Sequence, residues 1–119
     1  MWIADGVVIG NDVRIQAFTF IPYGVTIEDG AFIGPRVTFT NDPRMEMSMD
    51  KWEKTLVKKG AKIGAGVIIK AGVTIGENAV IGMGAVVTHS VPDGQTWVGS
   101  PARKLYRHKA KPPNYYQEV

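Results

Sequence analysis

Large apolar side chains recur at every sixth position along most of the sequence. The series is interrupted once and then resumes in the same phase: Ile3, Ile9, Ile15, Ile21, Ile27, Ile33 and Phe39, followed by Val57, Ile63, Ile69, Ile75, Ile81 and Val87. On an α-helix with about 3.6 residues per turn, positions six apart do not stay on one face. The pattern therefore excludes an amphipathic helix and indicates a chain that turns in regular six-residue units.

Each unit has the alternation of a short β-strand. In Val25-Thr26-Ile27 the first and third side chains lie on one face of the strand and the middle one lies on the other. A glycine such as Gly24, or an aspartate or asparagine, precedes most of these strands and permits the positive φ of a sharp corner. Strands and corners at a fixed pitch predict a β-solenoid, whose successive coils lie about 4.8 Å apart and pair in parallel.

The units resemble those of the hexapeptide-repeat acyltransferases. Ile63-Gly64-Ala65-Gly66-Val67-Ile68 and Ile81-Gly82-Met83-Gly84-Ala85-Val86 match the family pattern of an aliphatic residue, a glycine, two variable residues, a small residue and one more variable residue. The resemblance covers residues 1 to about 105 and implies an all-β, left-handed parallel β-helix with three units per coil and about five coils. The left hand comes from the family alone, since the general rule for parallel crossovers would give a right hand.

Outward-facing positions suggest that subunits associate. With three units per coil, residues eighteen apart are expected to share a flat face, as Arg14 does with Phe32 and Ile68 with Val86. Apolar residues occupy several outward positions: Phe20, Phe32, Ile68, Val80 and Val86. This repetition favours a buried contact between subunits over scattered surface hydrophobes. The resemblance likewise implies a homotrimer with its active sites between neighbouring helices.

The repeat fails once, and residues 40–56 are expected to project as a loop, where binding and catalytic residues tend to collect. Its large apolar side chains are expected to pack against a neighbouring subunit or to contact substrate: Met45, Met47, Met49 and Trp52. The route of this loop decides whether Phe32 and Ile68 share a face. Residues 106–119 contain Pro112-Pro113 and are expected to form an irregular C-terminal tail.

The start of the loop carries the candidate catalytic residues. Val37-Thr38-Phe39-Thr40-Asn41-Asp42 is similar to the V-T-F-T-N-D stretch of the hexapeptide branch that N-acetylates nucleotide-linked amino sugars, notably 3-amino-3,6-dideoxyhexoses. The similarity implies that Asn41 and Asp42 lie beside the acceptor amine. These residue types suit the reaction, because an amine must be oriented and lose a proton when it attacks a thioester. Asn41-Asp42-Pro43 is also an ordinary turn initiator.

Three further residues are candidates for contact with the acceptor: Tyr23, Arg44 and Trp52. Tyr23 lies eighteen residues before Asn41 and hence is expected one coil directly beneath it. The amino-sugar branch often has an acidic residue at this position. Tyr23 therefore favours an alternative acceptor, a small amine such as an aminoglycoside-like compound.

The histidine content separates the activities found in the wider family. Sugar O-acetyltransferases and the antibiotic-modifying branch need a histidine base in or near the loop, and γ-type carbonic anhydrases need three histidines to hold zinc. This chain has only His89 and His108, and neither lies in the loop. The sequence therefore favours N-acetylation and predicts no metal.

The acyl donor implied by the resemblance is acetyl-CoA, which would lie along the last coils. In the family the pantetheine arm contacts backbone at corner positions, here Ala65 and Met83. The segments Val87-Thr88-His89-Ser90-Val91-Pro92 and Gly99-Ser100-Pro101-Ala102-Arg103-Lys104 are similar to the family's V-T-K-D-V-P and G-N-P-A-R/K, which approach the nucleotide end of the coenzyme. The candidate coenzyme-binding residues are thus Ala65, Met83, Thr88, His89, Arg103 and Lys104.

The composition limits the classes of protein and the kinds of partner that remain possible. A chain of 119 residues with 14 glycines fits one turn-rich β domain, residues 1–105, too small to enclose a large private pocket. The net charge is +3, but the basic residues are not interleaved with aromatic ones as in nucleic-acid-binding modules, so no nucleic-acid partner is expected. The absence of cysteine excludes disulfides and a cysteine nucleophile. No signal-peptide pattern or membrane-length apolar run is present, so a soluble, cytoplasmic protein without a membrane partner is expected.

These observations predict an acetyl-CoA-dependent N-acetyltransferase that acts on a nucleotide-linked amino sugar, a precursor of surface polysaccharide, and works as a homotrimer. Two alternatives remain. One is an acyltransferase for another small amine, and the other is a non-catalytic trimeric hexapeptide scaffold.

Overall fold

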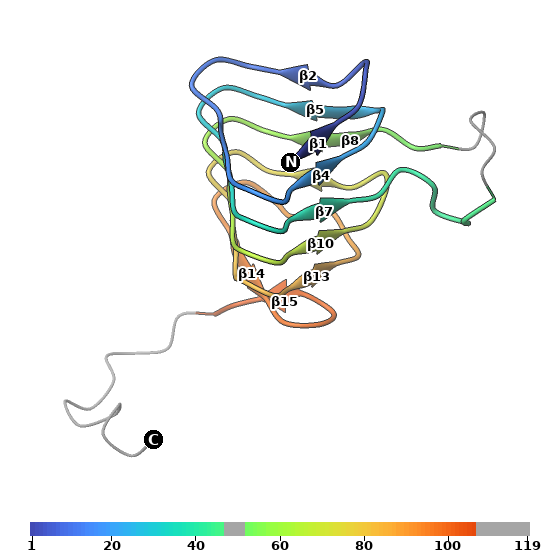
Figure 1. The fold of residues 1–119 in the computed structure, drawn as a ribbon. Helices are drawn as coiled ribbons and strands as arrows, with labels where there is room; N and C mark the ends of the chain where they lie inside the picture. The colour runs from blue at the N-terminus through green and yellow to red at the C-terminus, as the bar shows by residue number, and fades with distance from the viewer. Residues whose placement is uncertain (47–51, 107–119) are drawn as a thin grey trace.

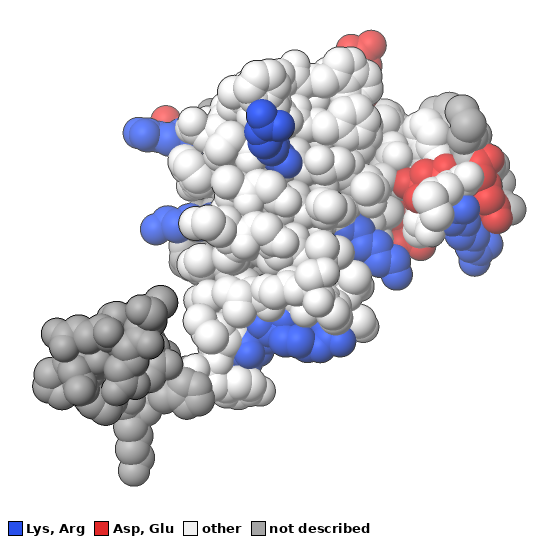
Figure 2. Space-filling view, turned by 60° about the horizontal axis from the view of Figure 1, so that its bottom comes forward, with Lys and Arg blue, Asp and Glu red and all other residues white. Residues whose placement is uncertain are grey.

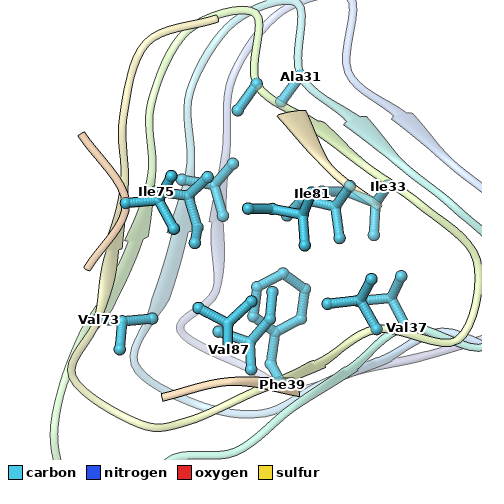
Figure 3. Packing of buried hydrophobic residues seen from close by; sticks show 14 of the residues in the cluster. Ala31, Ile33, Val37, Phe39, Val73, Ile75, Ile81 and Val87 are labelled. Carbon is cyan, nitrogen blue, oxygen red and sulfur yellow. The ribbon is translucent and has the colours of Figure 1, made fainter. Parts of the chain in front are cut away.

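The protein is a stack of short parallel strands. Its structure is a computed structural model that describes residues 1–46 and 52–106. Within these ranges the chain forms fifteen strands and no helix. The strands follow the chain through successive coils that stack along one axis (Figure 1), and each coil encloses a triangular section (Figure 3).

Three sheets form the faces of the triangle. The first face contains β1 (Trp2–Ile3), β4 (Phe20–Ile21), β7 (Thr38–Phe39), β10 (Ile68–Ile69) and β13 (Val86–Val87). The second face contains β2 (Val8–Ile9), β5 (Val25–Ile27), β8 (Thr55–Val57) and β11 (Thr74–Ile75). The third face contains β3 (Arg14–Ile15), β6 (Phe32–Ile33), β9 (Lys62–Ile63), β12 (Val80–Ile81), β14 (Thr96–Val98) and β15 (Arg103–Lys104). All pairs are parallel except β14 with β15, so the chain forms the predicted parallel β-helix, with five coils.

Three corners connect these faces. The first corner, between the first and second faces, includes the described residues 4–6, 22–24, 40–46, 52–54, 70–72 and 88–90. The second corner, between the second and third faces, includes residues 10–12, 28–30, 58–60, 76–78 and 92–94. The third corner, which returns the chain to the first face, includes residues 16–18, 34–36, 64–66 and 82–84, whereas residues 99–101 reverse the chain between β14 and β15 of the third face.

The register confirms the pairs that the repeat predicts and settles the route past the loop. Arg14 pairs with Phe32, and Ile68 pairs with Val86. Across the interruption Ile68 pairs with Thr38, thirty residues earlier instead of eighteen, so the loop adds twelve residues to one coil. As a result Phe32 lies on the third face beside Lys62, not on the face of Ile68.

The loop at the first corner is shorter than the expected range of 40–56. Strand β8 already begins at Thr55, which pairs with Val25 of the coil below and is 1% exposed. Its hydroxyl oxygen accepts a hydrogen bond from Gly72 N at 3.1 Å. Because this polar group is satisfied inside the helix, threonine can replace an aliphatic residue there, which the apolar pattern alone did not reveal.

The core consists of the inward residues of the six-residue series, stacked coil upon coil (Figure 3). From the second coil onward these side chains are almost completely buried, and Ile21, Ile33 and Ile69 are 0% exposed. In the first coil Ile3 and Ile9 are 39% and 38% exposed, because no described coil covers them. At the opposite end Val91 and Ala102 are buried, so the described chain closes the core there.

The same substitution should lower the free energy of unfolding by different amounts in the covered part of the core and in its open first coil. Ile21→Ala is expected to lower the free energy of unfolding by about 2–5 kcal/mol, because it leaves a cavity between two coils. Ile3→Ala, one coil earlier on the same face, should cost clearly less, since part of its side chain is already in solvent. Urea unfolding at one fixed protein concentration measures both losses. Equal losses would contradict the open first coil.

Candidate active site

The first corner brings the two predicted catalytic residues and Tyr23 together at the base of the loop. Asn41 lies one coil above Tyr23, as the sequence predicts, and its Nδ2 donates a hydrogen bond to Tyr23 O at 2.8 Å. Glu53 N at the far end of the loop donates to Asn41 O at 3.0 Å. Asn41 therefore ties both ends of the loop to the coil beneath and holds its own side chain in a fixed direction.

Asp42 starts a tight turn immediately after Asn41. Its Oδ1 accepts a hydrogen bond from Arg44 N at 3.2 Å, and its carbonyl oxygen accepts one from Met45 N at 3.3 Å. The turn-forming role of this segment is therefore present in the structure, as its composition suggests. It fixes the carboxylate of Asp42, the residue that follows Asn41, while the Arg44 side chain is exposed.

Two aromatic rings border this corner. The centroids of Tyr23 and Trp52 are 6.5 Å apart and their planes are tilted by 50°. Trp52 Nε1 is buried and has no hydrogen-bond partner in the described structure. A buried N–H without an acceptor costs about 1–3 kcal/mol, so this indole is a donor that a bound ligand or a neighbouring subunit can satisfy.

The Tyr23 ring rests on the backbone of the coil beneath. A Cβ added at Gly6 would lie 2.7 Å from ring carbons of Tyr23, and Gly6 has a φ of 83°. Only glycine combines this close approach with a left-handed backbone without strain. The sequence identifies Gly6 as a corner residue, but its contact with Tyr23 appears only when the coils are stacked.

The predicted donor-binding residues fall into separate places. Ala65 and Met83 lie at the third corner, where Gly84 N donates to Ala65 O at 2.8 Å and Met83 is 82% exposed. The predicted acceptor residues lie at the first corner, so the two sets stand at opposite edges of the first face. Its outward side chains are Trp2, Phe20, Thr38, Ile68 and Val86. One chain therefore does not bring the two sets together.

The remaining predicted donor residues lie near the C-terminal end of the described helix. His89 and Arg103 line one pocket of about 270 Å³ together with Trp97, and Thr88 Oγ1 is 3.0 Å from His89 Nδ1. Lys104 instead lines a second pocket of about 440 Å³, where its Nζ lies 4.8 Å from the centroid of the Tyr106 ring. Figure 2 shows one patch of Lys and Arg side chains at this end of the molecule and further ones spread over the rest of the visible face.

Trp97 was missed by the sequence analysis because the last coil is short. Val91 bridges to Ile75, and Trp97 pairs with Ile81, each sixteen residues later instead of eighteen. Trp97 therefore occupies a position stacked on the apolar series although it is out of phase with it. A shift of two residues in the phase after Val87 is the signal that would have found it.

The part of the chain that the structure describes contains no group of three or more histidine, cysteine or acidic residues placed to hold a metal ion. None of its segments is a helix long and apolar enough to cross a membrane.

The sequence matches one family profile, described as bacterial transferase hexapeptide (six repeats), over residues 3–41 and 54–89. Because these ranges make up more than half of the chain, the protein belongs to the bacterial transferase hexapeptide family. A comparison with curated proteins finds no match.

Solved acetyltransferases have similar structures. A truncated serine acetyltransferase apoenzyme matches with a TM-score of 0.74 and 30% identity, over 84% of this chain and 41% of that protein. A hexapeptide-repeat acetyltransferase from Vibrio cholerae O1 biovar eltor, solved with acetyl coenzyme A, matches with a TM-score of 0.63 and 26% identity, over 89% and 62%. The chain thus spans less than two thirds of either protein. These likenesses confirm the left-handed parallel β-helix, since a helix of opposite hand would not superpose in this way.

An N-acetyltransferase of an amino-sugar nucleotide also has this architecture. The GDP-perosamine N-acetyltransferase from Caulobacter crescentus, in complex with CoA and GDP-perosamine, matches with a TM-score of 0.72 over 88% of this chain and 53% of that protein. The identity is 20%, and at this level the likeness shows the fold alone.

Replacement of Gly6 tests the packing beneath the site. Gly6→Ala is expected to displace the Tyr23 ring and to change the near-ultraviolet circular dichroism of the aromatic residues. Gly30→Ala is the matched control, because Gly30 also has a positive φ, 71°, but has no atom within 4 Å of an added Cβ. The control should lower the free energy of unfolding by about 1 kcal/mol through backbone strain, and Gly6→Ala should lower it further. Identical spectra and stabilities for the two variants would contradict the contact.

Proposed function

We propose that this protein is an acetyl-CoA-dependent N-acetyltransferase that acts on a nucleotide-linked amino sugar and works as a homotrimer. The observation that carries the proposal is the pair of consecutive residues fixed at the first corner, where the Asn41 amide is anchored to Tyr23 O and the Asp42 carboxylate accepts a hydrogen bond from Arg44 N. The family membership and the acetyl coenzyme A bound to the Vibrio cholerae neighbour support the donor.

The first part of the proposed mechanism concerns the acceptor amine. The Asp42 carboxylate attracts the ammonium form and can receive the proton that the nitrogen must lose. Asn41 Nδ2 is already bound to Tyr23 O, so Asn41 Oδ1 can accept a hydrogen bond from an amine N–H. That bond would aim the nitrogen lone pair at the thioester and lower the orientational cost of the attack.

The second part concerns transfer of the acetyl group. The amine nitrogen attacks the thioester carbonyl carbon, a C–N bond forms, and the carbonyl oxygen carries the negative charge of the tetrahedral intermediate. Backbone N–H groups of the groove between subunits would stabilise that charge. The C–S bond then breaks. The nitrogen of an ammonium acceptor loses two protons in all: the one taken up by Asp42 before the attack passes to solvent, and the one lost after the C–N bond forms ends on the coenzyme thiolate, which leaves as the free thiol.

The residue content of the loop favours an amine over a hydroxyl as acceptor. No histidine occurs in residues 40–56, so the loop offers no imidazole base. An alkylammonium loses its proton far more readily than an alcohol, and a carboxylate is a sufficient acceptor for it. Trp52, with its buried and unpartnered indole N–H, would donate to an oxygen of the acceptor.

The location of the two residue sets supports a site shared between subunits. The acceptor residues at the first corner and Ala65 and Met83 at the third corner can meet when the first corner of one copy approaches the third corner of the next. The apolar first face lies between these corners, and the stacked rings of Trp2 and Phe20, 4.8 Å apart and inclined by 10°, belong to it. Burial of this face in a trimer would remove apolar surface from water.

The pocket lined by His89, Trp97 and Arg103 is the proposed site for the nucleotide end of acetyl-CoA. A guanidinium and an imidazole can bind phosphate, and an indole can stack on adenine. Lys104 lies outside this pocket, so we assign it no more than attraction of the coenzyme through its charge.

Enzyme assays test the chemistry. We expect release of free thiol from acetyl-CoA in the presence of one or more amino-sugar nucleotides, and Asn41→Ala and Asp42→Asn should each lower kcat/KM for the acceptor by about a hundredfold. The affinity for acetyl-CoA, measured by calorimetry, should not change in either variant. Asn11→Ala at the second corner is the matched control, since in the described part of the chain Asn11 forms its hydrogen bonds to Asp29 and Gly30 through its backbone. Full turnover in the Asn41 and Asp42 variants would exclude their roles, and turnover of aminoglycosides alone would favour the alternative acceptor.

Mixed oligomers test whether two chains share each site. Asn41→Ala removes an acceptor residue, and Ala65→Trp blocks the third corner where the donor would bind. Each variant alone should have about a hundredth of the wild-type activity or less. A co-refolded equal mixture should recover about a quarter of the wild-type activity, because at one site in four an intact Asn41 from one chain meets an intact Ala65 from its neighbour. No recovery in mixtures shown by sedimentation to be trimeric would contradict a shared site.

A further inference from the structure

The third corner carries two side chains that its backbone does not favour. Phe18 and Arg36 have φ angles of 63° and 60°, in the left-handed region. In the two coils that follow Arg36, the equivalent position of the third corner is occupied by Gly66 and Gly84, with φ angles of 71° and 73°. A bulky residue in this conformation is strained, whereas glycine is not. Strain of this kind is retained most often where a side chain has a function.

Both side chains point away from the helix. An added Cβ at Gly66 or Gly84 would have no atom within 4 Å, so side chains at this corner position point into open space. Phe18 is 69% exposed, and the guanidinium carbon of Arg36 lies 5.2 Å from the centroid of its ring. The pair is thus an exposed aromatic ring beside an exposed guanidinium group.

The place of this pair on the helix relates it to the proposed reaction. Ala65 and Met83, the proposed contacts of the pantetheine arm, lie on the same corner on the C-terminal side of Arg36. If the coenzyme extends from the thioester toward the C-terminal end, the acceptor must approach from the other side, since the two substrates meet only at the carbonyl carbon. The part of the acceptor remote from its amine would then extend along the corner toward Arg36 and Phe18.

We propose that Phe18 and Arg36 form a binding site for a nucleoside diphosphate, the carrier portion of the acceptor. This inference rests on the proposed function for its placement, but the ligand class follows from the two side chains. The guanidinium binds phosphate oxygens through paired N–H groups, and the open side of the Phe18 ring offers a stacking surface for the base. The corner of one subunit would hold the carrier while Asn41 and Asp42 of the next hold the amine.

Calorimetric titration of the full chain with UDP, dTDP and GDP tests the site without any turnover. At least one of these probes should bind, and Arg36→Gly and Phe18→Gly should each weaken its binding by about tenfold or more. Inorganic pyrophosphate should bind more weakly than the diphosphate and lose its affinity only in the Arg36 variant, while the nucleoside should respond only to the Phe18 variant. Because glycine removes the strain of a left-handed backbone conformation, both variants should unfold at the wild-type temperature or above it.

Asp12→Gly is the matched control. Asp12 has a φ of 56° at the second corner, so the exchange relieves the same backbone strain at a place remote from the proposed site. It should leave nucleotide affinity unchanged. Absence of binding by all three probes, or equal binding by the wild type and both variants, would overturn the proposal, and so would loss of the trimer in the two variants, which would make the pair a subunit contact.

The outcome is distinguishable from failure of the proposed function. If no acetyl transfer is found but a nucleoside diphosphate binds through Arg36 and Phe18, the site stands and the reaction is wrong. If acetyl transfer occurs and KM for the amino-sugar nucleotide is the same in the wild type and both glycine variants, the reaction stands and this site is wrong.

Discussion

Parallel stacking of identical coils is the constraint on which the rest of the structure depends. Each coil donates backbone N–H groups to the next, as in the bonds from Thr38 N to Val67 O and from Ile68 N to Ala85 O, at 2.9 and 3.0 Å. These bonds hold the same inward position of every coil directly above its predecessor, so an apolar side chain is needed at each one. The six-residue series and the corner glycines are both consequences of this geometry.

The same constraint explains where the proposed chemistry can lie. The interior of the helix is filled by side chains and has no room for a substrate, so ligands must bind outside it. The loop at the first corner departs from the stack without disturbing it. The backbone bond from Glu53 N to Asn41 O closes its base, the Asn41 side chain bonds to Tyr23 O, and Thr55 re-enters the core with its hydroxyl satisfied. A rigid scaffold thereby presents Asn41 and Asp42 in a defined place.

In the proposed trimer, neighbouring chains would bring together the two residue sets that a single chain holds apart. The first face is flat and apolar, and the residues proposed for the acceptor and for the donor stand at its two edges. A three-fold assembly that buries this face would bring those edges together and would also cover the stacked rings of Trp2 and Phe20. The proposed nucleoside diphosphate site at Phe18 and Arg36 extends the same shared groove toward the N-terminal end.

The sequence by itself determined the solenoid and its buried series, because both depend on a local periodicity that is repeated in every coil. The resemblance to the hexapeptide family supplied the three units per coil, and hence the number of coils. It also placed Tyr23 beneath Asn41, since eighteen residues make one coil where the repeat is intact. Only the tertiary structure decided that Phe32 lies beside Lys62, that Trp97 joins His89 and Arg103, and that Lys104 lies elsewhere. The physical reason is that twelve additional residues in the loop and two missing ones in the last coil change the register between neighbours, and such changes are visible only when the coils are stacked.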